Sequence, residues 1–130
     1  MAGPVERAVR ASIEPGKTLY TVPKRAPFVI QVIDERGVVL LLGRKRAWTR
    51  LSWDCLESIP PFLRERGCVR VASVFSVDSD PDSLDGYLKR CIKRATAGWV
   101  ASLLEEAGVV AVDAGPPATV RLRLGEPPGR

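Results

Sequence analysis

The chain has 130 residues, which is the length of one domain, and its 20 Lys and Arg outnumber its 15 Asp and Glu to leave a formal net charge of +5. It contains no histidine, so the side chain most often used as a general base and as a metal ligand is missing. This composition argues against an enzyme. The longest purely apolar run, Val38 to Leu42, is far shorter than the roughly 20 residues of a transmembrane helix, and the first residues lack the apolar core of a signal peptide. We therefore expect a soluble cytoplasmic protein without a membrane partner.

Both ends of the chain are rich in glycine and proline. Residues 1–16 contain two glycines and two prolines around a short helical turn, which predicts a flexible lead-in. Residues 125–130, Gly-Glu-Pro-Pro-Gly-Arg, add nothing to a core and predict a flexible tail. The folded part is therefore expected between residues 17 and 124.

Residues 17–51 predict a small antiparallel β-meander. The segment from Phe28 to Ile33 is rich in β-branched residues, and Asp34-Glu35-Arg36-Gly37 is a hairpin signal because Gly37 can adopt a positive φ. A basic turn at 43–47 leads to the last strand. The expected strands are 19–22, 28–33, 38–42 and 48–51.

Residues 52–124 predict a second half that begins with a helix. Ser52 fits a helix N-cap that precedes apolar residues at helical spacing. Pro60 and Pro61 should divide this helix, because proline removes a backbone donor and its ring clashes with the preceding turn. We therefore expect one helix to about residue 58 and a separate turn to residue 66, closed by Gly67.

The rest of this half predicts a strand, two helices and a hairpin. Apolar residues from Leu84 to Ala95 recur at helical spacing, which indicates an amphipathic helix after an acidic loop at 78–82. Residues 99–107 predict another helix, ended by Gly108. We expect an α+β fold in which the meander and this helix-strand-helix-helix-hairpin half, residues 52–124, pack as one globular unit. The expected strands of this half are 69–77, 109–112 and 120–124, the last two joined by a turn at 115–117.

Two partial ligand-binding motifs each lack a required residue. Residues 14–18 end like a phosphate-binding loop, but Ala11 stands where the pattern needs glycine, so a turn into the first strand is the better interpretation. The acidic residues at 78–82 alternate as in a calcium loop, but Ser83 and Lys89 replace its glycine and glutamate. We expect these acids to precede a helix, whose dipole stabilises negative charge at its start.

No catalytic constellation is complete either. Asp34 has no Glu-x-Lys partner for a metal-dependent nuclease. Cys55, Cys68 and Cys91 are odd in number, widely spaced and without a histidine partner, and we expect Cys55 and Cys91 to be core residues. The sequence therefore predicts no catalytic residue, no metal and no cofactor.

The basic residues gather in clusters, with the acidic residues concentrated elsewhere. Clustering favours a polyanionic partner, although a solvated surface is the plainer explanation for each cluster. Trp48 stands among arginines, where it either stacks on a base or covers the sheet. The candidate nucleic-acid contacts from this pattern are Arg44, Lys45, Arg46, Trp48, Arg50, Lys89, Arg90, Lys93, Arg94, Arg121 and Arg123.

The order of elements after Ser52, and the string Thr96-Ala-Gly-Trp-Val-Ala-Ser-Leu-Leu-Glu-Glu-Ala-Gly-Val-Val followed by the hairpin 109–124, resemble the winged-helix family of helix-turn-helix domains. In that family the second helix of the pair lies in the major groove, and the hairpin, or wing, lies along the backbone or minor groove. The resemblance implies that Arg94 stands at the turn and Arg121 or Arg123 on the wing. It also implies that the DNA lies near Thr96, Ala97 and Ser102.

A looser resemblance comes from the front half. The string Phe28-Val-Ile-Gln-Val-Ile-Asp-Glu-Arg-Gly-Val-Val-Leu, followed by Thr49-Arg-Leu-Ser-Trp and a helix, looks like small accessory modules of bacterial restriction and defence proteins. It implies a DNA-reading or targeting role without catalysis.

The sequence as a whole predicts a non-catalytic module that binds double-stranded DNA, mainly through phosphate contacts, as an accessory or regulatory protein of a bacterial defence or transcription system. Such binding would be electrostatic and salt-dependent. Two alternatives stay open. One is a protein-protein interaction adaptor that uses a winged-helix-like surface, and the other is a small enzyme that uses Asp and Lys.

Overall fold

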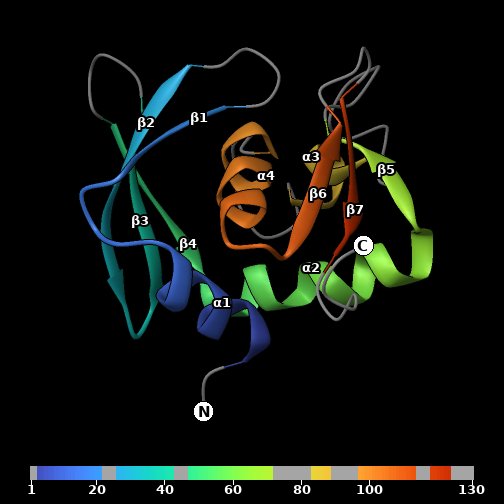
Figure 1. Cartoon of the computed structure of the whole chain (residues 1–130), viewed down its shortest axis with the longest axis horizontal. Coiled ribbons are helices and arrows are strands. Elements are labelled where there is room, and N and C mark those ends of the chain that lie inside the picture. Colours follow the sequence, from blue (N-terminus) through green and yellow to red (C-terminus); the bar gives the residue numbers. More distant parts are fainter. Residues whose placement is uncertain are drawn as a thin grey trace.

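A computed structural model describes residues 3–21, 26–42, 47–71, 83–88, 97–113 and 118–123. It has an α+β fold, as predicted, with a four-stranded and a three-stranded sheet on either side of one helix (Figure 1). The helices are α1 (Pro4–Ser12), α2 (Trp53–Arg66), α3 (Leu84–Leu88) and α4 (Ala97–Glu106). The strands are β1 (Thr18–Tyr20), β2 (Pro27–Asp34), β3 (Gly37–Leu42), β4 (Ala47–Ser52), β5 (Cys68–Arg70), β6 (Val110–Asp113) and β7 (Thr119–Leu122).

The predicted meander is confirmed as a four-stranded antiparallel sheet in the order β1-β2-β3-β4. Side chains alternate between the faces of a strand, so one face of this sheet is buried, with Phe28, Leu40 and Leu51 at no more than 1% exposure. A β-bulge between Ile30 and Val32 shifts the register of β2 against β3. As a result, Ile30 pairs with the buried Leu40 before the bulge, and Ile33 pairs with the buried Val38 after it.

The β2–β3 hairpin depends on glycine at position 37. Gly37 has a φ of +149°, and a β-carbon there would collide with the Leu51 carbonyl oxygen of β4. We expect Gly37→Ala to lower the free energy of unfolding by roughly 1–3 kcal/mol, measured by urea denaturation. Gly16→Ala is the matched control, since Gly16 also has a positive φ of +96° but no atom within 4 Å of a built β-carbon. If both variants lost the same free energy of unfolding, the close approach of Gly37 to β4 would not be what makes glycine necessary there.

The described part of residues 1–16 is a helix packed into the core, so the prediction of a flexible lead-in was wrong. Val5 and Val9 of α1 are fully buried. The N-cap residue Gly3 has no side chain to accept a hydrogen bond, and the Glu57 carboxylate of α2 accepts from the backbone N–H of Val5 at 3.0 Å and of Glu6 at 2.9 Å instead. A helix of this length is marginal alone, so its stability comes from a partner about 50 residues away in the chain.

Helix α2 is continuous, so the predicted division at the two prolines was also wrong. The predicted N-cap is confirmed, with Ser52 Oγ accepting from Cys55 N–H at 3.2 Å, and the helix ends at Gly67 as expected. Pro60 and Pro61 lie inside it. Fully buried apolar side chains lie on both sides of the prolines, so breaking the helix there would remove one turn from the core. The burial of that turn offsets the cost of roughly 3 kcal/mol that each proline imposes on the helix.

The remaining elements follow the predicted order, with shorter strands. The described part of the predicted 69–77 strand lies in β5, and the described part of the first amphipathic helix is α3. Tyr87 attaches α3 to α2 by donating a hydrogen bond to Ser58 Oγ at 2.6 Å. The predicted hairpin is confirmed by antiparallel pairing of β6 with β7, and β5 joins β7 on its other side. The acidic loop, the turn at 115–117 and the tail at 125–130 lie outside the described residues.

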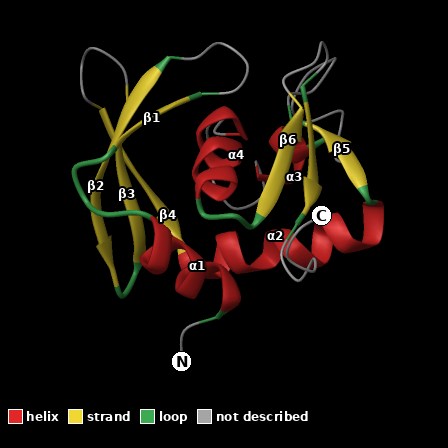
Figure 2. Cartoon of the chain, in the orientation of Figure 1, coloured by secondary structure: helices red, strands yellow, loops and turns green. Residues whose placement is uncertain are grey.

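The core is centred on α4, which lies between the two sheets with α1 and α2 beneath them (Figure 2). Val100, Leu103 and Leu104 are fully buried, and one cluster of buried side chains joins α1, the four-stranded sheet, α4 and the three-stranded sheet. Within the described ranges, no helix is long and apolar enough to cross a membrane.

Candidate nucleic-acid interface

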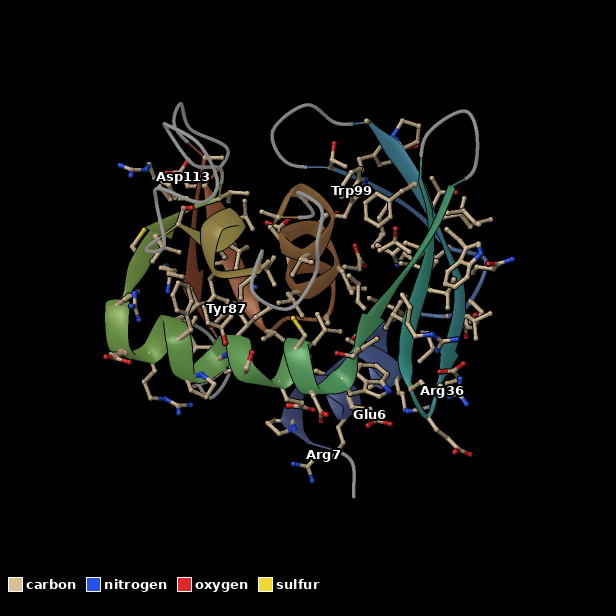
Figure 3. All side chains as sticks on the ribbon, turned by 180° about the vertical axis from the view of Figure 1, so that it is seen from behind. Glu6, Arg7, Arg36, Tyr87, Trp99 and Asp113 are labelled. Atoms are coloured by element: carbon tan, nitrogen blue, oxygen red, sulfur yellow. The ribbon has the colours of Figure 1, made fainter. Side chains whose placement is uncertain are left out.

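The outer face of the three-stranded sheet is polar and basic. Val69 and Val120 are neighbours across β5 and β7 and are both buried, so the residues that alternate with them point away from the core. The outward rows across the sheet are Cys68, Arg121 and Ala111, and then Arg70, Thr119 and Asp113. Figure 3 shows Asp113 at this side of the molecule.

Arginines from two strands and a helix end gather at this face. Arg121 and Arg123 are exposed and alternate with the inward-facing Leu122. Arg66 ends α2, with its guanidinium carbon 4.5 Å from the centroid of the Phe62 ring and its Nη1 3.8 Å from a carboxylate oxygen of Glu65. We call Arg66, Arg70, Arg121 and Arg123 the arginine face.

Two hollows open at the arginine face and share Cys68, which is exposed. The smaller has a volume of about 290 Å³ and lies beside Arg66 and Arg70. The larger has a volume of about 510 Å³ and is lined by Cys68, Ala111, Val112, Asp113, Thr119 and Arg121.

The other described candidates lie on the four-stranded sheet. Trp48 is 63% exposed on β4, next to Leu41 of β3. Arg50 was predicted to contact phosphate, but its Nη1 lies 2.9 Å and 3.2 Å from the two carboxylate oxygens of Asp34. Most of the charge of Arg50 is therefore matched by Asp34, and we assign it a structural role.

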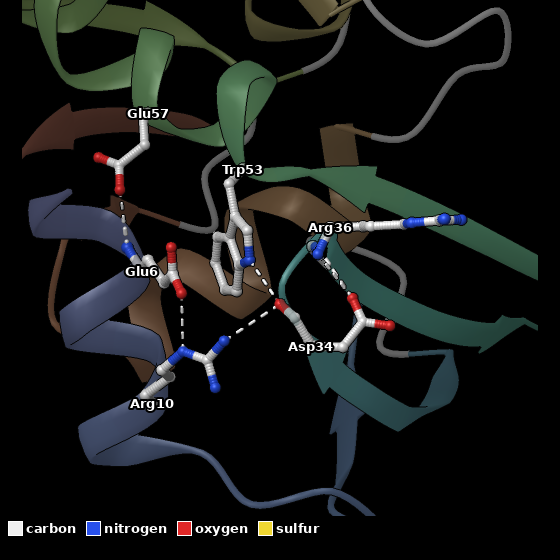
Figure 4. A network of polar contacts seen from close by, with 7 residues as sticks. Glu6, Arg10, Asp34, Arg36, Trp53 and Glu57 are labelled. Atoms are coloured by element: carbon white, nitrogen blue, oxygen red, sulfur yellow. Dashed lines mark hydrogen bonds and ion pairs between the residues drawn. The ribbon is translucent and has the colours of Figure 1, made fainter. Parts of the chain in front are cut away.

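Asp34 is the centre of the polar network in Figure 4. Its carboxylate accepts from the backbone N–H of Arg36 at 2.9 Å and of Gly37 at 3.1 Å, and its carbonyl oxygen accepts from Trp53 Nε1 at 2.7 Å. Arg10 of α1 also donates to that carbonyl, at 3.1 Å. The network therefore fastens the β2–β3 hairpin to α1 and α2.

The pKa of Asp34 is lowered from its ordinary value, most of all by the hydrogen bond from Arg36 N–H; desolvation, the second-largest effect, raises it, and Arg50 and Gly37 N–H lower it further. A folded-state pKa below the unfolded one means that the ionised carboxylate stabilises the fold above about pH 4, and that this contribution is lost as the pH falls through the folded pKa. We expect Asp34→Asn to be less stable than the parent protein at pH 7, with a smaller difference at pH 3, in urea denaturation. Glu35→Gln, an exposed change in the same turn, should show neither effect.

The structure does not bring the predicted contacts onto one surface. Trp48 and Arg50 point outward from the four-stranded sheet, and Arg121 and Arg123 point outward from the three-stranded sheet, with α4 between the sheets (Figure 1). A straight duplex could therefore reach only one of these surfaces at a time. The other predicted contacts, which lie outside the described residues, are Arg44, Lys45, Arg46, Lys89, Arg90, Lys93, Arg94 and Thr96.

Helix α4 does not present the residues that the winged-helix resemblance placed near DNA. Ala97 is 4% exposed and Ser102 is 8% exposed, because α4 packs against both sheets. A helix buried in this way cannot insert those side chains into a major groove, so this implication of the resemblance was wrong for Ala97 and Ser102.

Sequence reasoning missed Arg66 and Arg70. Arg70 alternates with Cys68 at the spacing that puts side chains on one face of a strand, and Arg66 is the last residue of the helix that precedes this strand. The alternation could be seen in the sequence, but only the pairing of β5 with β7 places Arg70 near Arg121, and only the packing of the end of α2 places Arg66 beside Cys68 and Arg70.

The described residues bear on two of the motif interpretations, whereas the acidic loop at 78–82 lies outside them. Gly16 and Lys17 form a turn into β1, as predicted, and Lys17 pairs with Glu106 at 2.8 Å. Cys55 is buried, as predicted. In the part of the chain that the structure describes, no group of Cys, Asp and Glu could hold a metal ion. No protein-family model, curated protein or solved structure matches the chain.

Proposed function

We propose that this protein is a non-catalytic module that binds DNA through the arginine face. The observation that carries the proposal is the gathering of four arginines from β5, the end of β7 and the end of α2 beside one sheet face, where the described carboxylates are Asp113 and Glu65. Guanidinium groups match phosphate oxygens in geometry and in charge, and most protein–DNA hydrogen bonds go to phosphate and sugar.

The order of elements supports a winged-helix-like use of the hairpin. Elements α2, β5, α3, α4, β6 and β7 follow one another in the order of the resemblance, in which the β6–β7 hairpin would correspond to the wing. Because α4 is buried, the contacts would come from this hairpin, from β5 and from the end of α2. Binding through a basic sheet face reads mainly the phosphate backbone, so we expect weak sequence preference in duplex DNA.

Such a module would serve in the cytoplasm as an accessory or regulatory component of a bacterial defence or transcription system. This part of the proposal rests on the resemblance of the front half to accessory modules of restriction and defence proteins.

Titration of a labelled DNA duplex at several salt concentrations tests the proposal. If each arginine of the arginine face neutralises one phosphate, the logarithm of the affinity should fall linearly with the logarithm of the salt concentration, with a slope of about −3.6. Absence of binding at about 50 mM salt would overturn the proposal, because phosphate contacts are strongest at low salt.

A protein-interaction adaptor is the second candidate, favoured by the outer face of the four-stranded sheet. Trp48 is 63% exposed there and Val32 is 37% exposed. Leu41 of β3 lies opposite Trp48, and Val29 of β2 lies opposite Leu41. Exposed apolar surface of this kind is typical of protein interfaces. Binding through it would depend little on salt and would be lost in Trp48→Ser, which should leave DNA affinity unchanged.

A further inference from the structure

The larger hollow at the arginine face has the make-up of a small-molecule site. Its volume of about 510 Å³ falls within the roughly 300–1,000 Å³ of typical ligand pockets. Cys68 and Ala111 give it apolar walls, whereas the Val112 side chain lies on the core side of β6, opposite Val120. Asp113, Thr119 and Arg121 supply an anionic acceptor, a hydroxyl and a cationic donor.

The register places these polar groups at two ends of the hollow. Thr119 and Asp113 are directly opposite each other on β7 and β6, so their β-carbons are roughly 5 Å apart. Arg121 lies two residues further along β7 on the same face, roughly 7 Å away along the strand. The hollow therefore has hydrogen-bonding groups for a polar edge at one end and a guanidinium for an anion at the other.

We infer that this hollow holds one unpaired nucleobase of bound DNA, with Asp113 accepting from an exocyclic amino group and Arg121 contacting the attached phosphate. The inference rests on the proposed function, because the arginine face must first bind DNA. A nucleotide has the required form, with a planar apolar body, a hydrogen-bonding edge and a phosphate at the far end.

The carboxylate determines which bases fit. An aspartate accepts hydrogen bonds from the N4 amino group of cytosine, whereas thymine has a carbonyl at the equivalent position and is repelled. A carboxylate has about four acceptor positions, so another contact of Asp113 leaves room for the base. Thr119 can donate to or accept from the same edge. Cytosine is therefore the preferred base and thymine the excluded one.

The base must also be free of its partner strand. A base inside a duplex shows only its groove edges and cannot enter a hollow, so the enclosed nucleotide comes from a single-stranded or locally unpaired stretch. Arg66, Arg70 and Arg123 lie outside the larger hollow, where they would contact neighbouring phosphates of that strand.

Fluorescence anisotropy with labelled (dC)12, (dT)12 and a 12-base-pair duplex at about 50 mM salt tests the inference. We expect (dC)12 to bind about 5-fold or more tightly than (dT)12, the lower end of the discrimination given by one specific base contact. Asp113→Ala should abolish this preference and leave (dT)12 and duplex binding at least as strong. Asp113→Asn, which keeps one acceptor oxygen, should retain part of it.

Glu65→Gln is the matched control, because it removes a carboxylate at the arginine face outside the larger hollow. It should raise the affinity for all three DNA molecules alike and leave the ratio of (dC)12 to (dT)12 unchanged. Arg121→Gln should weaken all three. Circular dichroism checks that each variant is folded.

The failures of the two proposals are distinguishable. Salt-dependent binding of all three DNA molecules with equal affinity for (dC)12 and (dT)12 overturns the nucleobase site and leaves DNA binding intact. No binding of any of them overturns both. If free deoxycytidine monophosphate binds as tightly as (dC)12, the hollow serves a free nucleotide, and its assignment to DNA is wrong.

Discussion

Leu104→Ala should lower the free energy of unfolding by about 2–5 kcal/mol, as measured by urea denaturation. Leu104 is fully buried in α4, which is packed between the two sheets. Truncating its side chain removes apolar contacts and leaves a cavity that rigid sheets on both sides cannot close. Much of the stability of a domain of this size would be lost.

Glu105→Ala is the matched control for this prediction. Glu105 is the next residue of the same helix, but it is exposed, so its replacement should change the free energy of unfolding by no more than about 0.5 kcal/mol. A loss below about 1 kcal/mol in Leu104→Ala would contradict the placement of α4 between the sheets.

Replacing all four residues of the arginine face with glutamine should remove most of the salt dependence of DNA binding. With one phosphate contact for each arginine, the parent protein should lose roughly 100-fold in affinity between 50 and 200 mM salt. The quadruple variant should lose only a few-fold over the same range and bind far more weakly at 50 mM. Anisotropy titrations of one labelled duplex at four or more salt concentrations measure both effects.

A pair of double variants separates the arginine face from net charge. R121Q/R123Q and R7Q/R36Q remove the same charge, but Arg7 and Arg36 are exposed elsewhere on the molecule (Figure 3). We expect R121Q/R123Q to reduce the steepness of the salt dependence by about 1.8 and R7Q/R36Q to leave it nearly unchanged. Equal reductions would show that DNA attraction comes from overall charge and not from the arginine face.

The sequence predicted most of the local structure because the signals are local. The β2–β3 hairpin needs a turn residue such as Gly37, and the start of α2 needs an N-cap such as Ser52, and both can be identified within a few residues of the chain. The fold class and the order of elements in the second half follow from the same kind of pattern.

The two helix predictions that failed depend on distant contacts. Helix α1 is capped by Glu57, and the continuity of α2 through Pro60 and Pro61 depends on buried neighbours from other elements. Neither contact leaves a mark on the neighbouring sequence, so propensity alone predicted a flexible segment and a broken helix.

The candidate site was only half predictable for the same reason. Basic character in the sequence identified Arg121 and Arg123, but it equally identified Arg50 of β4, whose charge is paired with Asp34 at the end of β2. Arg70 was missed because only the pairing of β5 with β7 places it near Arg121, and Arg66 was missed because only the fold brings the end of α2 to the same face.

The sequence by itself determined the β-meander, the helix starts and ends marked by caps and glycines, and the presence of basic clusters without a complete catalytic motif. The tertiary structure decided which charges share a surface and which helix is buried. The physical reason is the separation along the chain of the residues that interact. Hairpin turns and helix caps depend on residues only a few positions apart. Ion pairing, cross-strand neighbours and burial between two sheets are set by residues that are remote in sequence and close only after folding.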